Sequence, residues 1–246
     1  MQNIHYKRVL IKLSGEVLSG TKQFGIDYKV VSDLAHQIKE IHDKDIEIGI
    51  VIGAGNIFRG VSSEGEGMDR VSGDYIGMMG TIMNSVALQN ELEKISCDTR
   101  VMSALSIRQL AEPYIRRRAT RHLEKGRIVI FAGGTGNPYF TTDTAAALRA
   151  IEIKADIIIK GTKVDGVYDS DPEINKNAVK YENLSYKKVI DNELMVMDLT
   201  AITLCKENKL PISVLNINTG NKLKEFLFSE NKVGTRVGPR SRTNVS

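Results

Sequence analysis

Four glycine-containing turns are the segments of this chain best suited to binding an anion. Each follows a short hydrophobic run: SGE at 14–16 follows RVLIKL, GAGN at 53–56 follows EIGIVI, GGTGNP at 133–138 follows RIVIFA, and GTK at 161–163 follows DIIIK. Glycine lets backbone N–H groups approach a ligand closely, and a helix N-terminus beyond the turn favours negative charge. The turns therefore predict phosphate binding.

Basic side chains lie within a few residues of these turns, namely Lys12, Arg59, Lys160 and Lys163. Phosphoryl transfer depends on in-line positioning and on positive charge against the equatorial oxygens. Lys12 ends the first hydrophobic run, where its ammonium group can meet the transferring group. Asp198 precedes an apolar helical run, so it can cap that helix and orient the lysines, or act as a cap alone. The chemistry indicated is transfer of the terminal phosphoryl group of ATP to a small anionic metabolite.

Other familiar motifs are incomplete. Residues 15–22 have the glycine spacing of a P-loop, but the required Lys-Thr order is reversed. The acidic run at 169–173 resembles the start of a calcium loop without its glycine-centred continuation. The four histidines show no metal-ligand spacing, and no Ser-His-Asp set is recognisable. We therefore predict no metal site formed by the protein itself.

The elements that position the turns alternate between strand and helix patterns. We expect strands at 8–13, 47–52, 100–102, 127–132, 156–160 and 212–216. We expect helices at 28–44, 74–95, 142–154, 198–208 and 221–228. Several strands are apolar on both faces, which is typical of parallel strands covered by helices. The pattern predicts an α/β fold, a three-layer α/β/α sandwich with a mainly parallel central sheet, and the turns meet at the carboxyl edge of that sheet.

The composition is that of an ordinary globular protein, with 246 residues of which 41% are hydrophobic and 26% charged. No break or repeat divides the chain, so we expect a single domain over residues 1–231 with a loop or hairpin excursion at 164–186. The formal net charge of +4 matches the four basic residues of 232–246, which contain no acid. We expect that basic tail to be flexible and deletion of residues 233–246 to leave catalysis intact. The neutral main body argues against nucleic acid as a partner.

Location can be inferred from three negative features. No run approaches the roughly 18 apolar residues of a membrane-spanning helix, so we expect no membrane partner. The first residues are interpreted as a strand and not as a signal peptide. Cys97 and Cys205 are too few for a disulfide framework and are expected to be buried hydrophobic side chains. Together these features favour a cytoplasmic protein.

Several motifs resemble the amino acid kinase fold family, and within it the bacterial-type uridylate (UMP) kinases. The matching stretches are KLSGE at 12–16, FGID at 24–27, GAGNIFRG at 53–60, DYIGMMGTIMN at 74–84, TGNPYFTTD at 135–143, KGTKVDGVYDSDP at 160–172, LMVMDLTA at 194–201 and KLPISVLNIN at 209–218. TGNPYFTTD followed by TKVDGVYDSDP is specific to the uridylate branch. Ala54 replaces the middle glycine of the GGGN loop usual in that family.

The resemblance implies that the chain transfers the γ-phosphoryl group of ATP to UMP, giving UDP and ADP in pyrimidine biosynthesis, with Mg²⁺ carried in on ATP. It implies catalytic roles for Lys12, Asp198 and Arg59. The residues it assigns to ATP are Lys12, Leu13, Ser14, Gly15, Gly55, Arg59, Thr162, Tyr168 and Asp171. Those it assigns to UMP are Ala54, Asp74, Thr135, Gly136, Asn137, Pro138, Tyr139, Phe140, Thr141 and Thr142. Asp74 is also expected near a helix start, where it could instead be an N-cap.

The resemblance further implies a homohexamer, with GTP activating and UTP inhibiting many members. The region tied to GTP control corresponds to Gly20, Thr21, Lys22, Gln23, Phe24 and Gly25. Two alternatives remain open: an enzyme of the same fold that phosphorylates a carboxylate or carbamate, and a non-catalytic uridylate-sensing regulator. Asp74 and TGNPYFTT favour a nucleotide acceptor, and the presence of Lys12 and Asp198 favours catalysis.

Overall fold

The computed structural model describes residues 6–58, 67–172, 174–218, 220–229 and 233–239. Its main feature is a nine-stranded sheet in the order β4-β3-β5-β2-β1-β6-β10-β11-β9. The strands are β1 (Arg8–Leu13), β2 (Glu47–Ile52), β3 (Thr99–Ser103), β4 (Glu112–Pro113), β5 (Ile128–Ala132), β6 (Ile157–Thr162), β9 (Asn183–Leu184), β10 (Ile212–Asn216) and β11 (Thr235–Val237). Neighbours are parallel except β10 and β11, which are antiparallel. The predicted mainly parallel sheet is confirmed.

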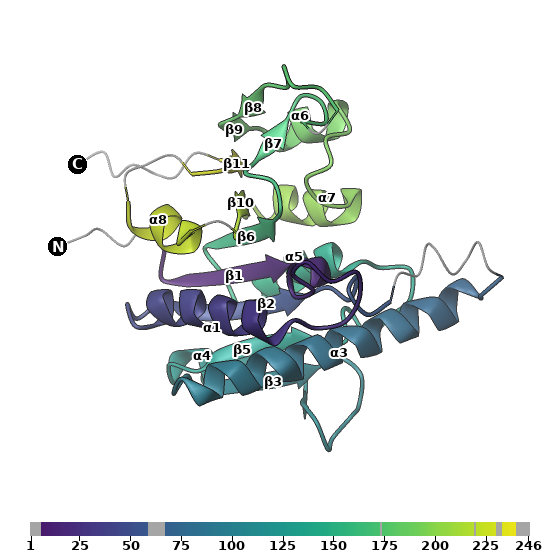
Figure 1. Cartoon of the computed structure of the whole chain (residues 1–246), viewed down its shortest axis with the longest axis vertical. Helices are drawn as coiled ribbons and strands as arrows, with labels where there is room; N and C mark the ends of the chain where they lie inside the picture. The colour runs from purple at the N-terminus through teal and green to yellow at the C-terminus, as the bar shows by residue number, and fades with distance from the viewer. Residues whose placement is uncertain (1–5, 59–66, 173, 219, 230–232, 240–246) are drawn as a thin grey trace.

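Helices cover both faces of this sheet, which gives the predicted three layers (Figure 1). One face packs against α1 (Tyr28–His42), α3 (Arg70–Lys94) and α8 (Lys222–Phe228). The other packs against α4 (Arg116–Glu124), α5 (Thr142–Glu152), α6 (Tyr186–Asp191) and α7 (Leu199–Glu207). A short 3₁₀ turn, η1 (Gly15–Val17), follows β1. No helix within the described residues is long and apolar enough to cross a membrane.

Alternation along β1 decides where Lys12 points. Val9, Ile11 and Leu13 pack in the core under α1, whereas Leu10 packs in the core on the α5 side. Because successive strand residues face opposite sides of a sheet, Lys12 shares the α5 face with Leu10. The first basic side chain of the predicted site is therefore buried between the central strand and one helix.

The start of α3 differs from the sequence prediction. Asp69 is the N-cap, accepting a hydrogen bond from the Ser72 N–H at 3.0 Å, and the helix begins at Arg70. Asp74 lies inside the first turns of this helix, so its interpretation as an N-cap is wrong. The sequence does not decide whether the helix begins after Asp69 or after Asp74, because aspartate is an equally good N-cap at either position.

The proposed flexible tail at 232–246 also needs correction. Thr235 and Val237 have no solvent exposure, and β11 pairs with β10 on one side and β9 on the other. Three residues flanked by glycine and basic residues are too few to show the alternating hydrophobic pattern of a strand. This strand can be recognised only from its pairing with β10 and β9 in the structure. Residues 240–246 lie outside the described part of the chain.

The segment 164–186, predicted to be a loop or a hairpin, contains a second, two-stranded sheet. Strands β7 (Val167–Tyr168) and β8 (Lys180–Tyr181) pair antiparallel in a hairpin that follows β6. In Figure 1 the hairpin lies with β9, β11 and α6 at the upper end of the molecule. Because β7 follows β6 in the chain, the hairpin is connected directly to the strand that carries Lys160.

Candidate active site

Two lysines and one aspartate form the charged centre of the site. Lys12 on β1 and Lys160 on β6 are register partners on neighbouring parallel strands. Asp143, in the first turn of α5, contacts the Lys12 Nζ through Oδ1 at 2.6 Å and the Lys160 Nζ through Oδ2 at 3.0 Å. Lys160 also donates to the Val196 carbonyl. One carboxylate thus holds two ammonium groups side by side at the carboxyl end of the sheet.

Burial and charge act against each other at this centre. Burial alone would raise the pKa of Asp143, but Lys12 and Lys160 outweigh it and lower that pKa. Burial lowers the pKa of Lys160; Asp143 opposes that shift and Lys12 adds to it. Asp198 also acts on Lys160 through its charge, so two ammonium groups and two carboxylates set the local charge balance, and the ammonium groups are the part that an incoming anion would contact.

Asp198 caps α7 as predicted, accepting from the Ala201 N–H at 2.8 Å. It also accepts hydrogen bonds from the hydroxyl groups of Thr144 and Thr141. The direct ion pairs to both lysines are made by Asp143, and Asp198 acts on Lys160 through its charge, so an orienting role of Asp198 stays a prediction. Asp198 joins the N-terminus of α7 to that of α5, and so fixes the helix that carries Asp143.

The first two glycine turns touch each other. A Cβ on Gly15 would lie 2.6 Å from Asn56 Oδ1, 2.7 Å from the Gly53 carbonyl oxygen and 2.7 Å from the Gly55 nitrogen. No side chain fits in that space, so the close approach of the two turns requires glycine at position 15. Asn84 of α3 holds the second turn by donating to the Gly53 carbonyl at 2.8 Å and to Asn56 Oδ1 at 2.7 Å.

A cavity of about 280 Å³ adjoins these turns and the N-terminus of α5. The predicted UMP residues that line it are Ala54, Asp74, Thr135, Phe140, Thr141 and Thr142. Asp74 accepts from the Tyr139 N–H at 2.7 Å and from Arg70 Nε at 3.0 Å. Tyr139 has a positive φ of 71°, which is unusual for a residue with a side chain, and the Asp74 contact stabilises that turn.

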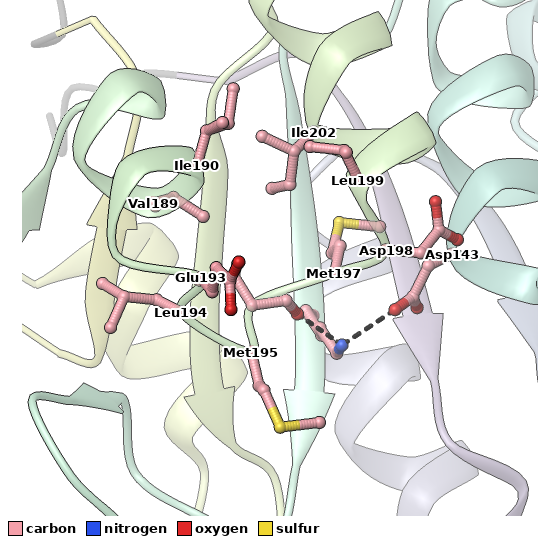
Figure 2. Close-up of a pocket in the computed structure, with 12 residues that line it drawn as sticks. Asp143, Val189, Ile190, Glu193, Leu194, Met195, Met197, Asp198, Leu199 and Ile202 are labelled. Carbon is pink, nitrogen blue, oxygen red and sulfur yellow. Dashed lines mark hydrogen bonds and ion pairs between the residues drawn. The ribbon is translucent and has the colours of Figure 1, made fainter.

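A larger cavity, about 650 Å³, has Asp143 and Lys160 of the charged centre in its lining. Figure 2 shows Val189, Ile190 and Leu194 along one side of it, and Asp143 and Asp198 along the other. Met195, at 98% exposure, lies on its margin. An apolar wall opposite a charged end suits a ligand with a flat apolar part and an anionic part.

The structure brings most, but not all, of the predicted residues together. Lys12, Leu13, Ser14, Gly15 and Gly55 lie at the adjoining turns, with the Leu13 side chain in the core. The UMP-assigned residues Gly136, Asn137, Pro138 and Tyr139 belong to the β5–α5 loop but are absent from the described lining of the smaller cavity. Arg59 lies outside the described residues.

The residues assigned to adenosine occupy a separate segment. Thr162 ends β6, Tyr168 is on β7, and Asp171 follows that strand. Among the described residues that line the larger cavity, none of the three occurs. A hydrogen bond to Asp165, aided by burial, raises the pKa of Tyr168 to about 12.

The fourth glycine turn has a different explanation from the one predicted. Gly161 lies within β6, and a Cβ there would come within 2.5 Å of the Ile217 side chain. Close packing on Ile217 accounts for this glycine. Lys163 lies on the α1 face, lining a cavity of about 270 Å³ with Gln37 and Asn218.

Sequence reasoning missed Asp143, Asn56 and Asn84 as contributors to the site. A signal existed for the position of Asp143, since an acid directly after the Thr-Thr pair is typical of the first turn of a helix, but that signal does not indicate its contact with the lysines. Lys160, the second lysine of the charged centre, was predicted only as a basic residue near the glycine turns. Its partnership with Lys12 depends on strand order and register.

Comparison with known proteins identifies the family of this chain. The model of the amino acid kinase family matches residues 7–216. The chain belongs to the amino acid kinase family. Within this family, the UMP kinase from Bacillus anthracis is 42% identical, with a TM-score of 0.91, and the match covers 95% of this chain and 96% of that chain.

Two further structures of this family are similar. The UMP kinase from Ureaplasma parvum is 41% identical, with a TM-score of 0.89, covering 95% of this chain and 99% of that one. The uridylate kinase from Archaeoglobus fulgidus is 27% identical, with a TM-score of 0.71, covering 97% of this chain and all of the other. The resemblance inferred from the motifs is confirmed.

Proposed function

We propose that this chain is a UMP kinase that transfers the γ-phosphoryl group of ATP to UMP, producing UDP and ADP in pyrimidine nucleotide biosynthesis. The observation that carries the proposal is the Lys12–Asp143–Lys160 cluster between two cavities. The smaller cavity contains six residues assigned to UMP. The similarity to bacterial UMP kinases over nearly the whole chain supports the same acceptor.

Each cavity receives one nucleotide in this proposal. The larger one accepts ATP with its base against the apolar wall and its phosphates toward Lys160. The smaller one accepts UMP, with the phosphate near the N-terminus of α5, where the helix dipole favours an anion. The acceptor and donor phosphates then meet beside Asp143, which belongs to the same helix turn.

The chemistry follows from charge and position. An oxygen of the UMP phosphate attacks the γ-phosphorus of ATP, and the bond from that phosphorus to the bridging oxygen of ADP breaks. The ammonium groups of Lys12 and Lys160 stabilise the negative charge on the transferring group. The attacking oxygen carries no proton at neutral pH, so no general base is needed.

Magnesium fits this site as a companion of ATP. The described residues contain no group of three His, Cys, Asp or Glu side chains that could hold a metal ion, and Asp143 and Asp198 already have partners. Ligands for Mg²⁺ would therefore come mainly from ATP phosphates. When bound, the ion would neutralise part of the phosphate charge.

An acceptor scan tests this function. ADP release is measured with UMP, CMP, dTMP, AMP, aspartate and glutamate, and we expect UMP to be strongly preferred. Preference for an amino acid would favour a carboxylate or carbamate kinase. UMP binding without any ADP release would favour the uridylate-sensing regulator.

Regulation and assembly belong to the same proposal. The segment 20–25, assigned to GTP control, touches the second glycine turn, since the Gly25 N–H donates to the Asn56 carbonyl at 2.7 Å and Asn56 Nδ2 donates to the Gly25 carbonyl at 2.9 Å. A shift there would move the phosphate-binding turn. We propose activation by GTP and inhibition by UTP, measured as the change in kcat on titration of each nucleotide.

A homohexamer in the cytoplasm completes the proposal. Tyr75, Met79 and Met83 form an exposed stripe at intervals of four residues along α3. Such a stripe suits contact with a second copy of the chain. Analytical ultracentrifugation should give the mass of six chains.

A further inference from the structure

The hydroxyl group of Thr81 joins helix α3 to the glycine turn that follows β5. Its Oγ accepts a hydrogen bond from the Gly133 N–H at 2.8 Å and donates to the Met78 carbonyl at 2.7 Å. Thr81 and Gly133 are both buried. Because a buried N–H that loses its acceptor carries the full cost of its desolvation, the position of this turn depends on the Thr81 hydroxyl.

The turn transmits the position of Gly133 to the smaller cavity. Gly133 and Gly134 have positive φ angles of 75° and 57°, and the Gly136 N–H donates to the Gly133 carbonyl at 2.9 Å. Gly133 is thus held through both its N–H and its carbonyl group. Gly134 and Thr135, the next two residues of the turn, line the cavity. A shift of Gly133 would therefore move part of the cavity wall.

Helix α3 forms another side of the same cavity. The α3 residues in the lining recur at spacings of three and four, so they share one face of the helix: Arg70, Gly73, Asp74, Gly77, Met78 and Thr81. Ala54 of the second glycine turn also lines the cavity, and Asn84 holds that turn to α3 through the Gly53 carbonyl. Thr81 and Asn84 thus attach the second and third glycine turns to one helix.

We propose that Thr81 is a positioning residue for the acceptor nucleotide: its hydroxyl group holds the turn at 133–136 at the distance from α3 that UMP requires. This inference rests on the proposed function, because it takes the smaller cavity as the UMP site. Among the described residues that line the larger cavity, none belongs to α3 or to this turn. Loss of the hydroxyl should therefore weaken binding of UMP and leave binding of ATP unchanged.

Thr81→Val tests the role, because it nearly keeps the shape of the side chain and removes the hydroxyl group. We expect the Kd for UMP, measured by calorimetry without ATP, to rise about tenfold, and the Kd for ATP without UMP to stay within about twofold. Thr81→Ala removes the hydroxyl without placing a methyl group against Gly133, and it should weaken UMP binding as well. Thr81→Ser retains the hydroxyl and should bind UMP within about twofold of the wild type.

Ser85→Ala is the matched control on the same helix. Ser85 is buried one turn beyond Thr81, and its hydroxyl donates to the Thr81 carbonyl at 2.7 Å. This variant loses a buried hydrogen bond that does not reach a glycine turn, so its UMP affinity should stay within about twofold even where its melting temperature falls.

Three results would overturn the positioning role. These are wild-type UMP affinity in both Thr81→Val and Thr81→Ala, a loss of ATP affinity equal to the loss of UMP affinity, or the same loss of UMP affinity in Ser85→Ala or Thr81→Ser. If the wild-type chain itself failed to bind UMP, the proposed function would fail, and this inference with it.

Discussion

At the scale of single residues, Asp143 decides the electrostatic character of the site. It contacts two lysines, and burial lowers the pKa of one of them, Lys160. The pKa of Asp143 is lowered, so the carboxylate stabilises the fold above its unfolded-state pKa, and this contribution is lost as the pH falls through its folded-state pKa. Removing an ammonium group and removing the carboxylate should therefore have different effects on catalysis and on stability.

Lys12→Ala removes the ammonium group beside the first glycine turn. We expect kcat to fall at least about a hundredfold, since a preorganised charge is worth about 3–4 kcal/mol in the transition state. UMP affinity should change little, because Lys12 is not among the described residues lining the smaller cavity. Steady-state kinetics measure both quantities, and a near-normal kcat would exclude Lys12 from the mechanism.

Asp143→Asn keeps the side-chain shape and leaves Lys12 and Lys160 without their shared counter-charge. The melting temperature should drop at neutral pH, because two adjacent ammonium groups then repel each other. Raising the pH to about 9.5 should recover part of the loss, since the pKa of Lys160 is already lowered. Thermal unfolding across this range gives the answer: the alkaline gain should exceed that of the wild type, and equal curves would contradict the prediction.

Asp74→Asn separates a ligand contact from a structural one. If the carboxylate binds the ribose hydroxyls of UMP, UMP affinity should fall ten- to hundredfold, about 1.5–3 kcal/mol, while ATP affinity stays constant. Asp69→Asn is the control, because Asn caps α3 about as well as Asp. Calorimetric titration with each nucleotide decides the matter. Unchanged UMP binding, or an equal loss for ATP, would refute the assignment.

At the scale of elements, adjoining turns and helix N-termini assemble the site. The β1 and β2 turns pack through Gly15, and the N-termini of α5 and α7 meet at Asp198. Each contact joins segments at the carboxyl ends of parallel strands. Small changes in these backbones should thus affect phosphate binding more than they affect the rest of the sheet.

Gly15→Ala places a methyl group against the second turn. Because two of the three nearest atoms are backbone, the turns must separate, and we expect a stability loss of about 1–3 kcal/mol with at least a tenfold drop in kcat/KM for ATP. Gly77→Ala adds the same methyl at a position in α3 with no atom within 4 Å and should raise stability by about 0.5–1 kcal/mol; because Gly77 lines the smaller cavity, it is a control for stability alone. Denaturant unfolding compares the two variants, and kinetics compare Gly15→Ala with the wild type. A tolerated Gly15→Ala would remove the steric argument.

At the scale of the whole molecule, the C-terminal segment completes the sheet. Deletion of residues 233–246 removes β11 with its buried Val237 and leaves β9 and β10 without a partner on that side. We expect a loss of about 3 kcal/mol or more from hydrophobic burial and hydrogen bonds. This reverses the expectation from the sequence that the tail is dispensable.

Denaturant unfolding of the truncated chain tests this change. Deletion of 240–246 alone is the comparison, and for those residues the expectation of retained activity stays a prediction. If the longer deletion unfolded at the same denaturant concentration as the full chain, β11 would contribute nothing to stability.

The sequence by itself determined the fold class, the family and the location of the glycine turns that follow β1, β2 and β5. Hydrophobic periodicity and glycine after a strand are local properties, and they survive in any arrangement of the elements. Strand ends at 8–13, 47–52 and 212–216 were predicted to the residue. The helix boundary at Asp69 was not, because several residues nearby can cap.

Only the tertiary structure decided how the charges are paired. Lys12 and Lys160 are 148 positions apart in sequence, and their partnership follows from β1 and β6 being neighbours in a defined register. Asp143 joins them because α5 crosses the same face. The role of β11 is likewise set by the strands on either side of it, since three residues have too little pattern of their own to indicate a strand.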